Sequence, residues 1–525
     1  MRAHQLSSSI VFSAVLLLGL FGMTARTATD SDLWWHLRTG QWIVETGHVP
    51  HSDLFSFTRG GSPWVSHEWL SEVILFELWR QGGAALLIVF SAIVTTAGFL
   101  LLYLRCPGKP HWAAAATALG ACAAAPFWGS RPQMFTFTLA SLLLWLVERG
   151  EQQPRLLLWI PPLFLLWLNL HAGFALGPAL LLLYAIGVTF EAVAGTTPWP
   201  QARLPILRVL MITLACLALV PLNPSGGQLY RYPFDTLRSH GMRSLIVEWS
   251  SPNFHRWLHV ALLVVFLLLF TALAVSRSPL KGRALLPLLF TSFAALDAVR
   301  HIPIFILLAI PVIAAALPAS KPSAILSPSP PPRSRPRAFF NAAALILLGA
   351  FTLWTWVDLA RQQETQEAAL FPESAVAFLR ASPQPERLFV YYDWGGYAIW
   401  KLYPQYRVFA DGRADLYGDD LLQQCIQTVV QLRQGWQAVL DRWNVQTILV
   451  PPGTALAQAL FLDPHWSIPY RDPRSVVFVR IEPPGGHPQF HPENALKPKK
   501  CILKPSRICE TRAMLGIGFI SSPGL

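Results

Sequence analysis

The sequence is poor in charge. Only 13% of its 525 residues are Asp, Glu, Lys or Arg, whereas 53% are hydrophobic, and the mean hydropathy is +0.40. Soluble domains carry roughly 25% charged residues. A single soluble domain is therefore excluded, and the composition predicts a chain that lies largely in a membrane.

Cysteine is scarce as well. The six cysteines are scattered, and no two have the CxxC spacing that is typical of zinc sites and redox pairs. Cys106, Cys122 and Cys216 lie in or beside apolar runs and are predicted to be small buried residues. Cys501 and Cys509 could form a disulfide if the tail lies outside the cell.

Acidic residues are outnumbered by basic ones, 29 to 41, which gives a formal charge of +12. Such a balance can indicate nucleic-acid binding, but here the basic residues do not cluster into a patch. They lie mostly in short gaps between apolar runs, where Lys and Arg mark cytoplasmic loops. The charge therefore reports membrane topology, and no nucleic-acid partner is expected.

About eleven apolar runs have the length of roughly 17–25 residues, with softened ends, that a membrane crossing needs. The first is interpreted as an uncleaved signal anchor, because no small-x-small cleavage site follows it. A cytoplasmic N-terminus then places the basic gaps inside and the C-terminal region outside. The predicted spans are 9–23, 84–104, 111–128, 134–147, 156–170, 174–192, 206–222, 258–275, 284–298, 302–317 and 339–357.

The fold class predicted from this pattern is mainly α, a polytopic membrane protein with a small C-terminal α/β domain outside the cytoplasm. The membrane domain covers residues 1–358 and includes a first outer loop at 25–83. A Pro-rich cytoplasmic linker lies at 319–337, and a tail at 483–525 is expected to be disordered. Within the α/β domain, 368–482, strands are expected at 388–392, 407–410, 447–450 and 476–481, with a helix at 420–443.

The first outer loop begins with two carboxylates, Asp30 and Asp32, directly after the first span. Carboxylates at this place can deprotonate an acceptor or hold a divalent cation, Mg²⁺ or Mn²⁺; no other cofactor is expected. A helix N-cap is the structural alternative. Amphipathic, Trp-rich helices are predicted at 32–46, ending at Gly47, and at 66–80, ending at Gly82 and Gly83.

The other outer loops carry basic side chains that could bind a lipid phosphate. Guanidinium groups bind phosphate bidentately, so Arg131, Arg231 and Arg300, with His301, are the candidate ligands of a donor phosphate. Snorkelling at the membrane edge is the alternative for each. Further polar candidates on the same face are His36, Glu68, His171 and Glu248.

Two motifs follow strands of the predicted α/β domain. Tyr392-Asp393-Trp394-Gly395-Gly396 comes after the first strand, and Asp411-Gly412-Arg413 comes after the second. Ligands of open α/β sheets bind beyond the carboxyl ends of strands, so Asp393, Trp394 and Asp411 are candidate acceptor-binding residues. Ordinary turn chemistry is the alternative.

Together these features resemble the C-type glycosyltransferase (GT-C) superfamily, and in particular its uncharacterised bacterial members. The Asp30 and Asp32 pair matches that superfamily's acidic motif in the first outer loop. The motif around Asp393 is similar to the acceptor motif of oligosaccharyltransferase catalytic subunits, with a different residue order and an extra Gly. The resemblance implies a polyprenyl-phosphate or polyprenyl-pyrophosphate sugar donor, and Asp30 and Asp32 as catalytic base or metal ligands.

The predicted function is therefore inverting sugar transfer from a lipid-linked donor to a lipid, glycan or protein acceptor at the outer face of a bacterial inner membrane. One alternative is a transporter or lipid flippase, for which repeated halves with broken spans are expected; no such repeat is seen. Another is a non-catalytic assembly protein, in which the acidic pair would be dispensable.

Overall fold

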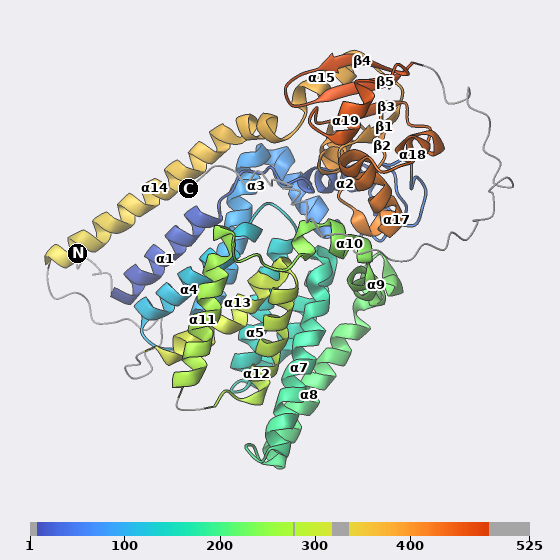
Figure 1. Ribbon diagram of the computed structural model, residues 1–525. Coiled ribbons are helices and arrows are strands. Elements are labelled where there is room, and N and C mark those ends of the chain that lie inside the picture. The colour runs from blue at the N-terminus through green and yellow to red at the C-terminus, as the bar shows by residue number, and fades with distance from the viewer. Residues whose placement is uncertain (1–7, 277–278, 318–334, 482–525) are drawn as a thin grey trace, which may run out of the picture. The chain divides into compact units, whose positions relative to one another are not determined.

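Helices dominate the described part of the chain, which comprises residues 8–276, 279–317 and 335–481 (Figure 1). Most of the Pro-rich segment predicted at 319–337 lies outside these residues. The tail predicted at 483–525, with Cys501 and Cys509, lies wholly outside them.

Each of the predicted membrane segments corresponds to a helix of the structure. Six helical stretches are long and apolar enough to cross a membrane, so the chain is an integral membrane protein. The exact number of crossings stays a prediction, because several of the other helices are shorter. The helices are α1 (Ser8–Thr24), α3 (Trp69–Arg105), α4 (Pro110–Ala124), α5 (Gln133–Gly150), α6 (Ile160–Leu170), α7 (Leu176–Val193), α8 (Trp199–Ala218), α11 (Val260–Val275), α12 (Gly282–Asp297), α13 (Ile302–Ala316) and α14 (Arg335–Leu370).

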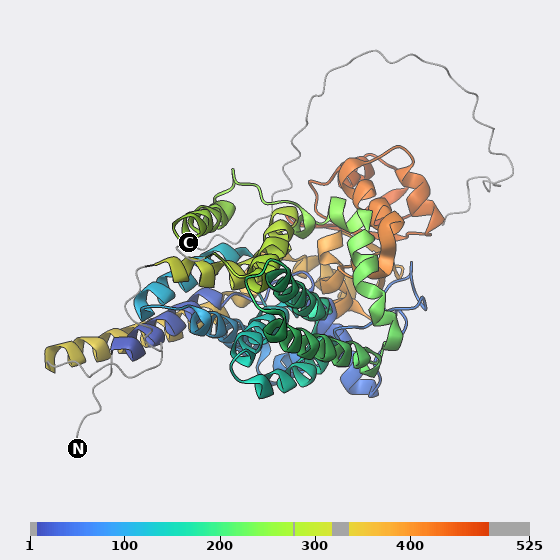
Figure 2. The ribbon, with the colours of Figure 1, turned by 90° about the horizontal axis from the view of Figure 1, so that it is seen from below.

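The first and last of these helices are neighbours. Helices α1 and α14 lie side by side in both views (Figures 1 and 2). A Cβ added at Gly22 of α1 would lie 3.9 Å from the Thr352 hydroxyl of α14. Beyond α14 the chain enters the α/β domain, so this helix carries the domain back to the end of α1 from which the first loop starts.

The first loop contains the two expected amphipathic helices. Helix α2 (Leu33–Thr46) ends at Gly47, whose φ of 72° requires glycine. Helix α3 begins at Trp69, three residues later than predicted, and its helical geometry breaks at Gly82 and Gly83. The predicted interfacial helix and the following span are thus two parts of one kinked element.

Short helical segments form the remaining outer loops. The polar residues that the sequence places on one face lie in or next to these segments, which are too short to cross a membrane. The segments are η1 (Ala125–Phe127), η3 (Ala172–Ala175), η4 (Val220–Leu222), η5 (Gly226–Tyr230), α9 (Tyr232–Arg238), α10 (His240–Leu245), η6 (Val247–Trp249), η7 (Trp257–His259) and η8 (Val299–His301); η2 (Pro154–Trp159) precedes α6.

The C-terminal domain is a five-stranded sheet with helices, as predicted. The strand order is β2-β1-β3-β5-β4. Strands β2, β1 and β3 pair in parallel, and β5 pairs antiparallel with both of its neighbours, β3 and β4. The strands are β1 (Arg387–Val390), β2 (Arg407–Val408), β3 (Thr447–Val450), β4 (Trp466–Arg471) and β5 (Val476–Arg480). Strand β4 was not predicted, because its Pro469 is unfavourable inside a sheet; the strand lies at the edge, where proline is tolerated.

The helices of this domain differ from the prediction at one place. The helix expected at 420–443 is divided into α17 (Ala414–Ile426), a π-helical turn (Gln427–Gln431) and α18 (Trp436–Arg442). Leu432 and Gly435 have φ angles of 45° and 89°, which end a right-handed helix. The other helices are α15 (Glu373–Ala381), η9 (Tyr392–Trp394), α16 (Gly395–Leu402) and α19 (Ala455–Leu460).

The α/β domain contacts the first outer loop directly. The Val408 amide of edge strand β2 donates to the Phe55 carbonyl, and the Val408 carbonyl accepts from the Phe57 amide, both at 3.1 Å. A Cβ at Gly396 would lie 2.7 Å from the Ser31 carbonyl oxygen. The two glycines after the strands, Gly396 and Gly412, therefore allow the domain to lie against the acidic motif.

Candidate functional site

The acidic pair lies in the link between α1 and α2. Asp32 stands at the N-cap position of α2, but its side chain makes no capping hydrogen bond. The Asp32 amide instead donates to Asp30 Oδ1 at 2.9 Å, which fixes the Asp30 side chain against the backbone of Asp32. The Asp32 carboxylate is therefore free for contacts across the site, and capping does not account for it.

Arg131 joins the acidic pair to a third carboxylate. Its Nη2 lies 2.5 Å from Asp32 Oδ2, its Nη1 lies 2.5 Å from Glu248 Oε1, and its Nε lies 3.4 Å from Asp30 Oδ1. The four side chains are 17–28% exposed, so the cluster is open to one side. Residues from the first loop, the loop before α5 and η6 thus converge on one guanidinium.

Three carboxylates share one positive charge here, and this shifts their pKa values. Burial raises the pKa of Asp32 to about 7; the charge of Arg131 opposes the shift, and the charges of Asp30 and Glu248 reinforce it. Burial likewise raises the pKa of Asp30, against the charge of Arg131. Burial also acts to raise the pKa of Glu248, but the charges of Arg131 and Arg300 outweigh it and lower that pKa. Asp32 is therefore suited to exchange a proton near neutral pH.

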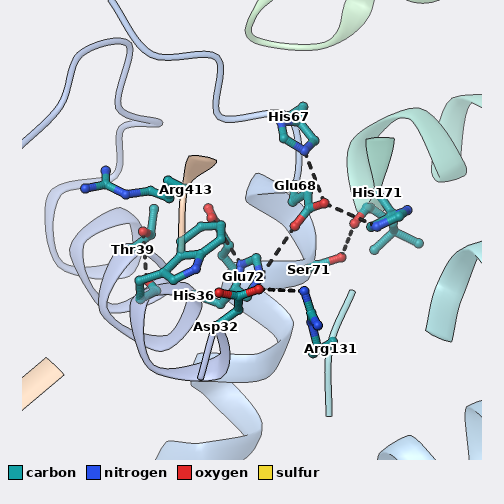
Figure 3. A network of polar contacts seen from close by, with 12 residues as sticks. Asp32, His36, Thr39, His67, Glu68, Ser71, Glu72, Arg131, His171 and Arg413 are labelled. Atoms are coloured by element: carbon teal, nitrogen blue, oxygen red, sulfur yellow. Dashed lines mark hydrogen bonds and ion pairs between the residues drawn. The ribbon is translucent and has the colours of Figure 1, made fainter. Parts of the chain in front are cut away.

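A second polar cluster surrounds Glu68, next to the first (Figure 3). The Glu68 carboxylate lies 3.1 Å from His67 Nε2 and 3.5 Å from the Nε2 atoms of both His36 and His171. The Gly173 amide donates to His171 Nδ1 at 2.9 Å, so the ring carries its proton on Nε2, towards Glu68. One carboxylate thus orients side chains from α2, the loop before α3 and the loop before α7.

Of the three histidines around Glu68, one is protonated and two are neutral. His67 Nδ1 lies 3.0 Å from the Val65 carbonyl oxygen and its Nε2 faces Glu68, so both nitrogens meet acceptors and the ring is protonated. Burial acts to lower the pKa of His67, but the charge of Glu68 outweighs it and raises that pKa to about 9. Burial lowers the pKa of His36 to about 3 and that of His171 to about 4. His67 and Glu68 therefore form a buried ion pair with two neutral imidazoles beside it.

The three candidate arginines have different surroundings. Arg131 is fully engaged with carboxylates, and Arg231, whose side chain is 83% exposed, precedes α9 and pairs with Asp235 of that helix at 2.8 Å. The Arg300 guanidinium lies over the Trp249 ring, 4.4 Å from its centre, and no ion pair joins it to another side chain in the described ranges. The neighbouring His301 is turned away, with Nδ1 at 3.2 Å from the Ala294 carbonyl oxygen. Arg300 is thus the one candidate cation of the three with a guanidinium not already paired.

The candidates in the α/β domain are divided between surface and interior. Asp393 is exposed, and the surrounding protein and, to a smaller extent, the charge of Asp30 raise its pKa. Gly396, in the same turn, packs against the Ser31 carbonyl between Asp30 and Asp32. Trp394 is buried, and its Nε1 donates to the Leu370 carbonyl at 3.0 Å. Asp411 is fully buried and binds the Arg413 guanidinium at 2.7 Å. Of the three, Asp393 alone faces the solvent beside the acidic pair.

Arg413 was not among the residues predicted for the site. Its guanidinium is 1% exposed and pairs with Asp53 at 2.8 Å as well as with Asp411, which ties the first loop to the α/β domain. Tyr232, whose hydroxyl lies 3.3 Å from His67 Nε2, was also missed. The adjacent His67 and Glu68 before an apolar helix were a signal for the second cluster, whereas nothing in the sequence indicated the partners of Arg413.

The arrangement does not fit the Mg²⁺ or Mn²⁺ site that Asp30 and Asp32 were expected to form. Divalent cations of this kind need several oxygen ligands around one point. Within residues 8–276, 279–317 and 335–481, no group of three or more His, Cys, Asp or Glu side chains is arranged to hold a metal ion. The oxygens of the acidic pair face Arg131 instead, so no chemical step is assigned to a metal.

Comparisons with known proteins identify the fold. No family model and no curated protein sequence matches the chain. Among solved structures, oligosaccharyltransferase AglB from Archaeoglobus fulgidus, in complex with an inhibitory peptide and a dolichol-phosphate, has a TM-score of 0.51 at 11% identity, over 84% of this chain and 69% of that one. The same enzyme tethered to an acceptor peptide gives 0.51 at 12% identity, over 85% and 69%.

A bacterial structure is less similar. ArnT from Cupriavidus metallidurans bound to undecaprenyl phosphate has a TM-score of 0.46 at 14% identity, over 91% of this chain and 99% of that one. The fold assignment rests on the two archaeal structures, which match 84% and 85% of this chain.

Proposed function

From the GT-C fold of this membrane protein, we infer that it is a glycosyltransferase that takes a sugar from a polyprenyl-phosphate or polyprenyl-pyrophosphate donor. The observation that carries the proposal is the partly open cluster of Asp30, Asp32 and Glu248 on Arg131, with the unpaired guanidinium of Arg300 on η8, which packs against the η6 segment of Glu248. The dolichol-phosphate in the archaeal neighbour supports a lipid phosphate as the donor group.

Asp32 is the proposed general base. The acceptor gives its proton to the Asp32 carboxylate while its nucleophilic atom forms a bond to the anomeric carbon of the sugar. The bond from that carbon to the phosphate oxygen breaks, and the lipid phosphate leaves with the electron pair. A single displacement of this kind inverts the configuration at the anomeric carbon.

Arg300 is the proposed ligand of the leaving phosphate. An unpaired guanidinium can donate two hydrogen bonds to phosphate oxygens and neutralise the charge that develops there. The Trp249 ring beneath it keeps the guanidinium in place without occupying its N–H groups. Arg131 has no free edge for this role, and Arg231 is paired elsewhere.

The acceptor is proposed to approach from the side of the α/β domain. Asp393 is exposed on that side of the cluster and can contact an acceptor. Trp394 and Asp411 are buried, so they stabilise the α/β domain and do not contact an acceptor. A lipid, glycan or protein acceptor is compatible with this opening. The chain is proposed to lie in a bacterial inner membrane with a cytoplasmic N-terminus and the α/β domain outside, since the basic gaps follow the positive-inside rule.

Transfer can be tested with purified protein in proteoliposomes that contain a bacterial envelope lipid and glycan extract as the acceptor source, with a panel of polyprenyl-phosphate sugars that carry a radiolabelled pentose or hexose. Wild type should release free polyprenyl phosphate, and the double variant Asp30→Asn with Asp32→Asn should not. Asp235→Asn, an exposed acid outside the cluster, is the matched control and should retain activity. Full activity of the double variant would refute the proposal, and movement of intact donor without cleavage would support the flippase alternative.

A further inference from the structure

We propose that the guanidinium of Arg131 is the resident cation of the acidic cluster, so that this site works without a divalent metal ion. That the site catalyses sugar transfer rests on the proposed function. The contacts of Arg131 with the three carboxylates are observed independently of it. The sequence predicts Mg²⁺ or Mn²⁺ on Asp30 and Asp32, whereas in the structure Arg131 contacts both side chains.

The contacts of Arg131 use every nitrogen of its guanidinium. Nη1, Nη2 and Nε face three different carboxylates, at 2.5, 2.5 and 3.4 Å. Asp30 and Asp32 lie in the link before α2 and Glu248 lies in η6, so the charge of Arg131 holds carboxylates from two distant parts of the chain together. Without that charge, three partly buried carboxylates would face one another, an arrangement that is strongly unfavourable.

Hydrogen bonds on both sides of Arg131 fix its backbone next to the acidic cluster. The preceding residue, Ser130, is buried, and its hydroxyl accepts from Ser91 of α3 at 3.0 Å. Pro132 follows, and the Arg131 carbonyl accepts from the Met134 amide at 3.1 Å in the first turn of α5. The arginine is therefore fixed between two anchored residues, which favours one position of its side chain over a mobile surface one.

A divalent ion among these oxygens would lie next to Arg131 and near Arg300. Like charges in a partly desolvated site repel each other, so metal binding would require the arginine to leave. Leaving would in turn break both 2.5 Å ion pairs. The acidic cluster therefore holds one singly charged cation, the Arg131 guanidinium, through ion pairs with its carboxylates.

Metal-free transfer is chemically balanced with the groups present. The acceptor proton goes to Asp32, the new bond forms at the anomeric carbon, and the phosphate departs with its electron pair towards Arg300. Arg131 takes no part in bond making; it is a positioning residue that keeps Asp30, Asp32 and Glu248 in place.

Manganese binding tests the inference independently of transfer. Purified protein in detergent is titrated with Mn²⁺ and followed by electron paramagnetic resonance, which detects free Mn²⁺. Wild type should bind no stoichiometric ion, whereas Arg131→Ala should bind one, because its three carboxylates have lost their cation. Arg231→Ala, which removes an exposed arginine outside the cluster, is the matched control and should behave as wild type.

Two results would overturn the inference. One is a stoichiometric Mn²⁺ ion in wild type that disappears in the Asp30→Asn, Asp32→Asn variant. The other is failure of folded Arg131→Ala to bind Mn²⁺, since the carboxylates would then not form a cation site. If Arg131→Ala does not fold, the wild-type titration decides.

Chelation supplies a second readout where transfer is measurable. Treatment with EDTA should leave the wild-type rate within about twofold, and a fall of tenfold or more that Mn²⁺ restores would contradict the inference. Loss of all transfer in every arm would instead count against the proposed function, and the binding titration would still decide the role of Arg131.

Discussion

At the scale of single residues, the central feature is the carboxylate of Asp32. It stands at the N-cap position of α2 but does not cap the helix, so its oxygens are available to the site. Asp32 shares Arg131 with two other acids and borders the α/β domain. The sequence could predict Asp30, Asp32, Arg131 and Glu248 as candidates, because loop sidedness places them on one face. It could not predict that they meet, since about a hundred residues separate partners whose approach depends on helix packing.

The pH dependence of transfer should report Asp32. Because its pKa is raised to about 7, the carboxylate is protonated below that pH and available as a base above it, so the rate should rise through neutral pH. Asp32→Asn should lower the rate by about 10²–10⁴-fold and remove this rise, whereas Asp32→Glu should retain it. Transfer rates measured from pH 5 to 9 check the prediction, which an unchanged profile in Asp32→Asn would contradict.

Gly412 should control the position of the same carboxylate from the other domain. A Cβ at this residue would lie 1.8 Å from Asp32 Oδ1, the mobile end of a side chain, so Gly412→Ala should displace the carboxylate without unfolding the protein. We expect a tenfold or greater loss of transfer with an unchanged melting temperature. Gly453→Ala, where nothing lies within 4 Å, is the control and should be silent in both measurements. Normal transfer by Gly412→Ala would show that the carboxylate tolerates displacement.

At the scale of elements, the position of the site depends on how α2 lies on α3. The end of α2 and the kink in α3 followed from glycines in the sequence, because Gly47 and Gly83 have φ angles of 72° and 58°, which other residues avoid. The packing of the two helices was not predictable, since Gly40 in the middle of α2 gives no sign of what it faces. It faces the backbone of Glu72, and this contact brings His36 to Glu68.

Gly40→Ala should therefore destabilise the protein. The added Cβ would lie 2.0 Å from the Glu72 carbonyl oxygen, a backbone atom that cannot rotate away. Overpacking of this kind costs about 1–3 kcal/mol, so the melting temperature in detergent should fall. Gly19→Ala in α1, with nothing within 4 Å, is the matched control and should not lower it. Equal melting of Gly40→Ala and wild type would mean that α2 can move off α3 at no cost.

At the scale of the whole molecule, the site exists because the α/β domain closes on the first loop. The sheet itself was predictable from its apolar runs, except for edge strand β4 with its proline. The docking was not, because it depends on Arg413, which the sequence presents as an ordinary residue of a turn. Its buried charge binds Asp53 of the loop and Asp411 of the domain.

Removal of that charge should separate the two parts. Arg413→Met leaves two buried carboxylates unpaired, which typically costs about 3–5 kcal/mol, so melting should occur at a much lower temperature. Arg231→Ala removes an exposed pair and should change stability by less than about 1 kcal/mol. Additional replacement of Asp53 by Asn should recover part of the loss. A melting temperature of Arg413→Met equal to wild type would show that the ion pair does not hold the domain.

The most direct test of one outward-facing site is the sidedness of its parts in intact cells. Single cysteines replace Thr46, Gln152 and Gln458, all exposed, in a background without the six native cysteines. A membrane-impermeant maleimide should label Thr46→Cys and Gln458→Cys, and should reach Gln152→Cys only after permeabilisation. Protection of Thr46→Cys and Gln458→Cys with labelling of Gln152→Cys would place the site in the cytoplasm and contradict transfer at the outer face.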